Sequence, residues 1–271
     1  MSWWEAVVLG LVQGFTEFLP ISSSGHLVLG RELLGIGPEE GTGILFEALV
    51  HFGTAMSILF VYRTEVLELT SGFFGGLFGA NSVRDSWNES DSFRTAVLIL
   101  ITVVPTALTY LLLGEAIEEA FTEPRFTAGM LLVTGTLLIL TRLRKEPRGD
   151  VTAVKAFVIG VAQSLAMFPG ISRSGATICA GIYQNVNPER ATNFSFLMLL
   201  PVVIAGAALK VSEALATEAD IFWGPIIIGA VVAFVSGVAA IRIMLEFVRK
   251  GRLEFFAVYC FIVGGLGLAL L

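Results

Sequence analysis

Polar side chains with catalytic or phosphate-binding chemistry gather at two places in this otherwise apolar sequence. The first place holds Gln13 and Glu17, followed by Ser22, Ser23, Ser24, Gly25 and His26. The second holds Ser172, Arg173, Ser174 and Gly175. A serine hydroxyl can act as a nucleophile, a histidine can act as its base, and the planar fork of an arginine matches phosphate oxygens. The two places therefore predict a site for a phosphate-bearing group.

Gln13 and Glu17 are four residues apart, so a helix would present both on one face. Their oxygen atoms could hold a divalent cation, Mg²⁺ or Ca²⁺, with water completing its shell. The alternative is a Gln–Glu hydrogen bond that only stabilises the local structure.

Each serine-rich turn is predicted to open a short helix, whose first N–H groups and positive dipole end attract anions. Two such ends facing each other would form a cradle for phosphate. Arg173 would add charged donors to this cradle, although an ion pair with Glu17 alone is the simpler alternative. The predicted substrate-binding residues are Ser22, Ser24, Gly25, Ser172, Ser174 and Gly175.

His26 lies three residues after Ser23, within plausible reach of a serine hydroxyl or a bound water as a general base. The alternative is a histidine that only packs. The other histidine, His51, follows Glu47 in an apolar segment. A role at the site is left open for Glu47, and packing is favoured for His51.

The composition indicates which elements must position these residues. Of the 271 residues, 55% are hydrophobic and only 15% are charged, and the mean hydropathy is +0.81. A chain with so little polar surface predicts an integral membrane protein. The net charge of −6 argues against nucleic acid as a partner.

The predicted fold is all-α, a single polytopic membrane domain over residues 1–271. It has six transmembrane helices and two re-entrant helical hairpins. The hairpins are predicted at 6–30 and 155–184, because Pro20 and Pro169 with neighbouring Ser and Gly interrupt two apolar stretches. Kinked spanning helices are the alternative. The six predicted spans are 44–62, 95–113, 126–141, 190–209, 223–242 and 255–271.

Basic residues orient the chain in the cell membrane. Thirteen of the 17 Lys and Arg fall in one set of loops, which the positive-inside rule places in the cytoplasm. Both termini are then predicted outside. The set comprises Arg63, Arg84, Arg94, Arg142, Arg144, Lys145, Arg148, Lys155, Arg190, Arg242, Arg249, Lys250 and Arg252.

The two interrupted stretches align without gaps at an offset of 150 residues, so that Gln13 pairs with Gln163. The pattern Ile-Ser-x-Ser-Gly occurs in both, with Ser23 in one copy and Arg173 in the other. Because three predicted spans follow each copy, the second copy would be inverted relative to the first. The repeats are placed at about 1–145 and 150–271, with a site at their interface.

The motifs at 13–26 and 169–178 closely resemble those of the bacterial undecaprenyl-diphosphate phosphatase family, the bacitracin-resistance type. Weaker similarity occurs at 46–47 and 194–197, and the pattern extends over nearly the whole chain. The resemblance implies hydrolysis of a C55-type polyprenyl diphosphate to the monophosphate with a divalent metal. Such an enzyme would recycle the lipid carrier for cell-wall glycan synthesis and confer bacitracin resistance.

By motif position, the resemblance makes Gln13 and Glu17 the metal or acid pair, Ser23 the nucleophile, His26 the base and Arg173 the phosphate clamp. Many relatives have Glu where this chain has Gln13, which favours Glu17 as the single essential acid. Either Ser23 attacks phosphorus after His26 takes its proton, or His26 activates water directly. A lipid-carrier flippase or other transporter is the rival function, because broken helices in inverted repeats also suit alternating access.

The outer leaflet is the expected location of the substrate. The site is therefore predicted to open to the outside.

Overall fold

The computed structural model describes residues 2–34, 42–79, 82–144, 146–216 and 223–271. Lys145, one of the thirteen basic residues predicted to lie in the cytoplasm, is outside these residues. Within the described ranges the chain is helical, and the only β-type pairing is an isolated bridge between Gly149 and Val186. The all-α prediction is confirmed.

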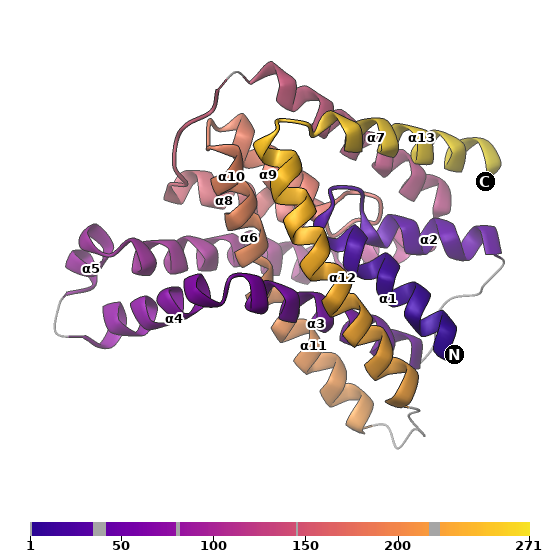
Figure 1. Cartoon of the computed structure of the whole chain (residues 1–271), viewed down its shortest axis with the longest axis horizontal. Coiled ribbons are helices and arrows are strands. Elements are labelled where there is room, and N and C mark those ends of the chain that lie inside the picture. The colour runs from indigo at the N-terminus through magenta and orange to yellow at the C-terminus, as the bar shows by residue number, and fades with distance from the viewer. Residues whose placement is uncertain (1, 35–41, 80–81, 145, 217–222) are drawn as a thin grey trace.

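Figure 1 shows the helices as a bundle in which α4 and α5 extend to one side and α2 and α13 to the other. Both ends of the chain lie on the side of α2 and α13. In chain order the elements are α1 (Trp3–Phe18), α2 (Ser23–Leu34), α3 (Thr42–Val61), α4 (Arg63–Phe78), α5 (Val83–Glu89), α6 (Asp91–Ala120), α7 (Pro124–Leu140), the 3₁₀ turn η1 (Thr141–Leu143), α8 (Ala153–Leu165), α9 (Arg173–Tyr183), α10 (Pro188–Leu197), α11 (Leu199–Ala216), α12 (Trp223–Arg249) and α13 (Glu254–Leu270).

Four helical segments of the described chain are long and apolar enough to cross a membrane. They are Asp91–Ala120, Pro124–Leu143, Pro188–Leu209 and Trp223–Arg249. They contain the predicted spans 95–113, 126–141, 190–209 and 223–242. The number of such helices rises to five if the bent pair described next forms one span.

The predicted span 44–62 corresponds to α3, but the chain continues past it into α4. The two helices are bent by 87° where Tyr62 leaves the helical conformation. The Tyr62 hydroxyl is tied to Asn193 at 2.8 Å, which anchors the bend against α10. The predicted span 255–271 corresponds to α13, whose 17 residues lie at the short end of the length that crosses a bilayer.

The two predicted hairpins are broken helices. α1 and α2 are separated by residues 19–22, and α8 and α9 by residues 166–172. Ser2 and Thr152 cap the starts of α1 and α8, where each side chain accepts a backbone N–H. α1 and α8 begin 150 residues apart, and so do α2 and α9, which is the offset of the sequence repeat.

Each broken helix packs on a long helix of the other half of the chain. α1 lies along α12, and α8 lies along α6. Both contacts need glycine, because a Cβ at Gly10 would come within 2.5 Å of the Gly229 carbonyl oxygen, and one at Gly160 within 2.7 Å of the Pro105 ring. The glycine that the two repeat copies share therefore permits the close packing of each hairpin.

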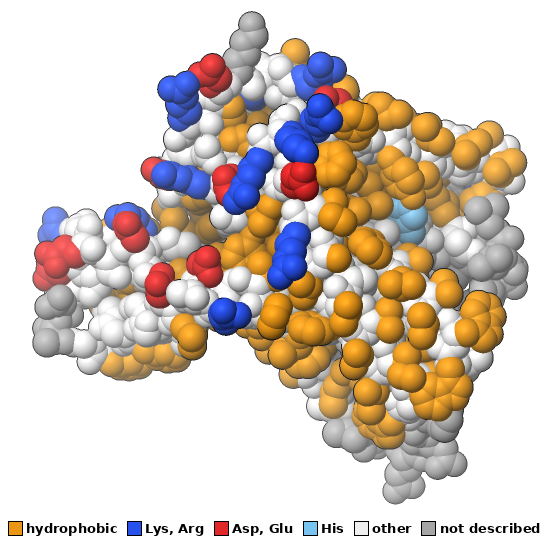
Figure 2. Space-filling model, viewed as in Figure 1, with side chains coloured by type: hydrophobic (Ala, Val, Ile, Leu, Met, Phe, Trp, Pro, Cys, Tyr) orange, Lys and Arg blue, Asp and Glu red, His pale blue; other side chains and the backbone are white. Residues whose placement is uncertain are grey.

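The surface is largely apolar. Large side chains such as Leu111, Phe78 and Leu112 are exposed, far beyond what a soluble monomer leaves open to water. Figure 2 shows hydrophobic side chains over the right and lower parts of the molecule, whereas Lys and Arg gather at its upper and left parts. This division fits a protein that sits in a bilayer with one basic face.

Candidate functional site

The two turns between the broken helices meet in the interior of the bundle. Ser22 Oγ accepts the Gly25 N–H at 3.1 Å, and Ser172 Oγ accepts the Gly175 N–H at the same distance. Each serine-rich turn opens a short helix, as predicted, and the two serines cap the starts of these helices, α2 and α9. The Ser174 hydroxyl donates to the Leu19 carbonyl at 3.3 Å and joins one turn to the other.

The two turns approach each other closely at glycine residues. A Cβ at Gly25 would lie 3.2 Å from the Cα of Gly170, and one at Gly175 would lie 3.3 Å from the Cβ of Pro20. On the far side, the Thr134 hydroxyl donates to the Gly170 carbonyl at 2.9 Å and accepts the Ser172 N–H at 3.0 Å. The second turn is therefore held by α7 as well as by the first turn.

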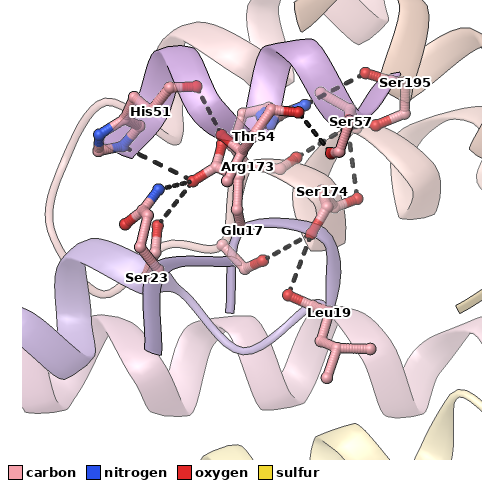
Figure 3. Close-up of polar contacts among 12 residues, drawn as sticks. Glu17, Leu19, Ser23, His51, Thr54, Ser57, Arg173, Ser174 and Ser195 are labelled. Atoms are coloured by element: carbon pink, nitrogen blue, oxygen red, sulfur yellow. Dashed lines mark hydrogen bonds and ion pairs between the residues drawn. The ribbon is translucent and has the colours of Figure 1, made fainter. Parts of the chain in front are cut away.

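Glu17, near the end of α1, is the centre of the polar contacts between the two halves. Its Oε1 accepts from Arg173 Nη2 at 2.7 Å. Its Oε2 accepts from the Ser23 hydroxyl at 3.0 Å and from Gln13 Nε2 at 2.9 Å, and it lies 3.6 Å from His51 Nε2. Figure 3 shows Ser23 and His51 pointing toward the Glu17 carboxylate.

Arg173 begins α9 and reaches across to α1. Besides its bond to Glu17, its Nη1 donates to the Ser195 carbonyl at 3.2 Å, and the Ser195 hydroxyl lies 2.6 Å from Thr177 Oγ1. The guanidinium is thus fixed in orientation by α10 while its side chain stays 14% exposed. Ser195 and Thr177 belong to this site although the sequence analysis gave neither a role. The weak motif at 194–197 was the available signal for Ser195.

A cavity of about 210 Å³ opens beside this cluster. Its wall includes six of the predicted site residues: Glu17, Ser22, Ser23, Ser24, Ser172 and Arg173. Glu47, His51 and Phe121 also line it, together with apolar residues of α11. Gln13, Gly25, Ser174 and Gly175 are buried next to it and are not among its lining residues.

The structure does not bring His26 to this cluster. Its Nδ1 lies 2.7 Å from the Ser22 carbonyl oxygen, and its Nε2 lies 2.6 Å from the hydroxyl of Tyr259 on α13. The two rings are stacked with centroids 5.5 Å apart, and His26 is not among the residues that line the cavity. Its role as a base stays a prediction.

The oxygen atoms around Glu17 fit a divalent cation that takes few protein ligands. In the described part of the chain no group of three or more His, Cys, Asp or Glu could hold a metal ion. However, Gln13 Oε1 is buried without a hydrogen-bond partner, next to the Glu17 carboxylate. Mg²⁺ commonly binds through one or two carboxylates and completes its shell with water and substrate phosphates. Gln13 and Glu17 are the residues that would hold such an ion.

Taken together, fold and site define a polytopic membrane protein with a partly open cavity at which Arg173, Glu17 and serine hydroxyls meet. Comparison with known proteins narrows the class: residues 6–266 match the model of the family described as bacitracin resistance protein BacA. The chain belongs to this family.

Several curated relatives match the chain over nearly its whole length. An undecaprenyl-diphosphatase of Salinibacter ruber is 55% identical over 271 residues and covers all of both chains. Proteins with the same name from Desulfatibacillum aliphaticivorans and Christiangramia forsetii are each 39% identical, over 97% of this chain and 97% and 96% of their own.

Proposed function

We propose that this protein hydrolyses undecaprenyl diphosphate, or a closely similar polyprenyl diphosphate, to the monophosphate and phosphate. The observation that carries the proposal is the contact of Ser23, Glu17 and Arg173 at the wall of one cavity. Family membership and the names of the curated relatives support the substrate. The reaction would recycle the lipid carrier for cell-wall glycan synthesis and confer bacitracin resistance.

Arg173 and the two helix starts would bind the diphosphate. The guanidinium faces the cavity, and the capped starts of α2 and α9 direct positive dipole ends toward it. On binding, phosphoryl oxygens would share the guanidinium donors with Glu17. These groups can stabilise negative charge that develops on the phosphoryl group in the transition state.

Ser23 is the proposed nucleophile. Its Oγ would form a bond to the terminal phosphorus as the bond from that phosphorus to the bridging oxygen breaks, and the prenyl monophosphate would leave. Water would then cleave the phosphoseryl bond and release phosphate. The Ser23 hydroxyl already donates to Glu17 Oε2, so Glu17 is the nearest acceptor for its proton. Direct attack by water remains the alternative route.

A bound Mg²⁺ or Ca²⁺ at Gln13 and Glu17 would neutralise charge on the phosphate oxygens. Chelation should then lower turnover, and added cation should restore it.

We also propose the finer topology: six spans and two re-entrant hairpins in inverted repeats of about 1–145 and 150–271. The reciprocal packing of α1 on α12 and of α8 on α6 supports the repeat. Phe121 lines the cavity and directly follows α6, whose other end adjoins α4 and α5 in the segment 63–94 that was predicted to be cytoplasmic. With basic loops in the cytoplasm, both termini and the cavity mouth would face outside.

A transporter of the lipid carrier is the rival, because broken helices meeting at an internal site also suit alternating access. The Ser23–Glu17 contact favours the enzyme, since transport requires an anion site but no nucleophile. The deciding experiment is phosphate release from undecaprenyl diphosphate by purified protein in detergent, with and without a chelator. Hydrolysis supports the enzyme, whereas lipid movement between leaflets without phosphate release would support the transporter.

A further inference from the structure

Tyr259 on α13 reaches the first turn, although it lies near the opposite end of the chain. Its hydroxyl is 2.6 Å from His26 Nε2, and the two rings are stacked. The neighbouring Cys260 places its Sγ 3.7 Å from the Pro20 carbonyl oxygen in the same turn. α13 therefore supports the first turn, just as α7 supports the second turn through Thr134. These two helices pack against each other (Figure 1).

The backbone of Ser22, directly before Ser23, has a conformation that a serine seldom adopts. Its φ of 68° lies in the left-handed region, so the surroundings must stabilise it. The Ser22 carbonyl oxygen accepts the backbone N–H of His26 at 3.2 Å, and His26 Nδ1 lies 2.7 Å from the same oxygen. The His26 ring thus holds the residue whose backbone sets the position of Ser23.

The two contacts of the His26 ring require one distribution of hydrogens. A carbonyl oxygen only accepts hydrogen bonds, so Nδ1 must carry a hydrogen. Nε2 of the neutral ring is then an acceptor, and the Tyr259 hydroxyl donates to it. Without this hydroxyl the hydrogen would be free to move to Nε2, and the lone pair of Nδ1 would face the Ser22 carbonyl oxygen. Tyr259 therefore selects the form of His26 that binds Ser22.

We propose that Tyr259 is a positioning residue, which acts through His26 on the first turn. It keeps His26 a donor to the Ser22 carbonyl. The backbone conformation fixed in this way holds the Ser23 hydroxyl 3.0 Å from Glu17 Oε2. Neither His26 nor Tyr259 is among the residues that line the cavity, so both act from behind the turn. The inference rests on the proposed hydrolysis and adds the residue that orients its nucleophile.

The role requires a donor at the place of Nδ1 and no base. His26→Asn keeps an amide N–H there and does not depend on a partner at Nε2, whereas His26→Ala has no donor. Tyr259→Phe and His26→Ala should lose at least about tenfold in kcat with a much smaller change in KM, because the effect is on the reacting geometry. His26→Asn should keep kcat within about threefold of the wild type.

A double variant separates positioning from a general loss of structure. Tyr259→Phe combined with His26→Asn should be as fast as His26→Asn alone, because the hydroxyl then has no ring nitrogen to hold. A purely structural loss caused by Tyr259→Phe would persist in the double variant.

The experiment measures phosphate release from undecaprenyl diphosphate by wild-type protein and these variants in detergent. Tyr110→Phe, which removes the hydroxyl of an exposed tyrosine on α6, is the control, and thermal unfolding reports on folding. If a His26 variant fails to fold, the comparison of Tyr259→Phe with Tyr110→Phe still decides. Normal kcat of Tyr259→Phe, a His26→Asn variant as slow as His26→Ala, or a double variant slower than His26→Asn overturns the inference. Wild-type protein without any phosphate release would instead contradict the proposed function.

Discussion

Among single residues, Arg173 and Glu17 carry opposite charges within the bundle and neutralise each other at 2.7 Å. An isolated charge at membrane depth costs several kcal/mol, so the pair explains how both residues are tolerated in apolar surroundings. In the proposed reaction, the Arg173 guanidinium would donate hydrogen bonds both to Glu17 and to the incoming phosphate.

Arg173→Ala should reduce turnover by at least about a hundredfold, the scale of removing one strong transition-state donor. Arg173→Lys should not restore it, because an ammonium group cannot donate to Glu17 and to Ser195 in the fixed fork geometry. Phosphate release under saturating substrate is the measurement. An Ala variant with near-normal kcat would remove Arg173 from the mechanism.

The nucleophile is tested by comparing Ser23→Ala with His26→Ala. If Ser23 attacks phosphorus, Ser23→Ala should abolish turnover while the lipid diphosphate still binds. If water attacks with His26 as its base, Ser23→Ala should keep substantial activity and His26→Ala should lose it. Rapid quenching of the reaction, followed by a search for phosphorylated Ser23, decides between the two routes.

The two histidines show the limit of sequence reasoning about single residues. Proximity along the chain made His26 the predicted base, since it follows Ser23 by three residues. Its partner is Tyr259, which is 233 residues away and could not be identified from the motif. His51 is brought to Glu17 by the packing of α1, α3 and α12, which depends on long-range contacts. Tertiary contacts therefore decide which histidine faces the cavity.

At the level of helices, the breaks after α1 and α8 were predictable because proline, glycine and serine interrupt two apolar stretches. The gapless repeat also predicted the matching starts of α1 with α8 and α2 with α9. The 87° bend after α3 was not predicted. Tyr62 and Arg63 continue an ordinary helical sequence, and the bend is anchored by a contact with Asn193 on another helix.

The packing of the hairpins on the long helices can be tested at Gly160. Gly160→Ala should destabilise the protein by about 1–3 kcal/mol, because the new methyl group would overlap Pro105 and the backbone of Thr102. Gly129→Ala is the matched control, since nothing lies within 4 Å of its new Cβ. Thermal unfolding in detergent compares the two. Equal stability of both variants would contradict the close approach of α8 to α6.

For the molecule as a whole, the decisive question is which side of the membrane the cavity faces. Basic residues gather on one face of the molecule (Figure 2). Phe121, which lines the cavity, directly follows the last residue of α6, whereas the first residue of α6 adjoins the segment that was predicted to be cytoplasmic. If the Phe121 end of α6 is outside, a membrane-impermeant thiol reagent added to intact cells should label Thr122→Cys and leave Ser82→Cys unmodified. Both positions are exposed, and the native Cys179 and Cys260 are buried.

The same reagent should also enter the cavity from outside and modify Met167→Cys, because Met167 lies in the cavity wall. Inorganic pyrophosphate, which mimics the headgroup of the lipid, should slow this labelling without affecting Thr122→Cys, since only the cavity residue would be covered. Labelling of Ser82→Cys from outside, with Thr122→Cys and Met167→Cys protected, would invert the proposed topology. Labelling of Met167→Cys only in opened cells, with Thr122→Cys still reactive in intact ones, would leave the topology in place. It would show that the cavity opens to the cytoplasm, where a lipid diphosphate in the outer leaflet could not reach Ser23.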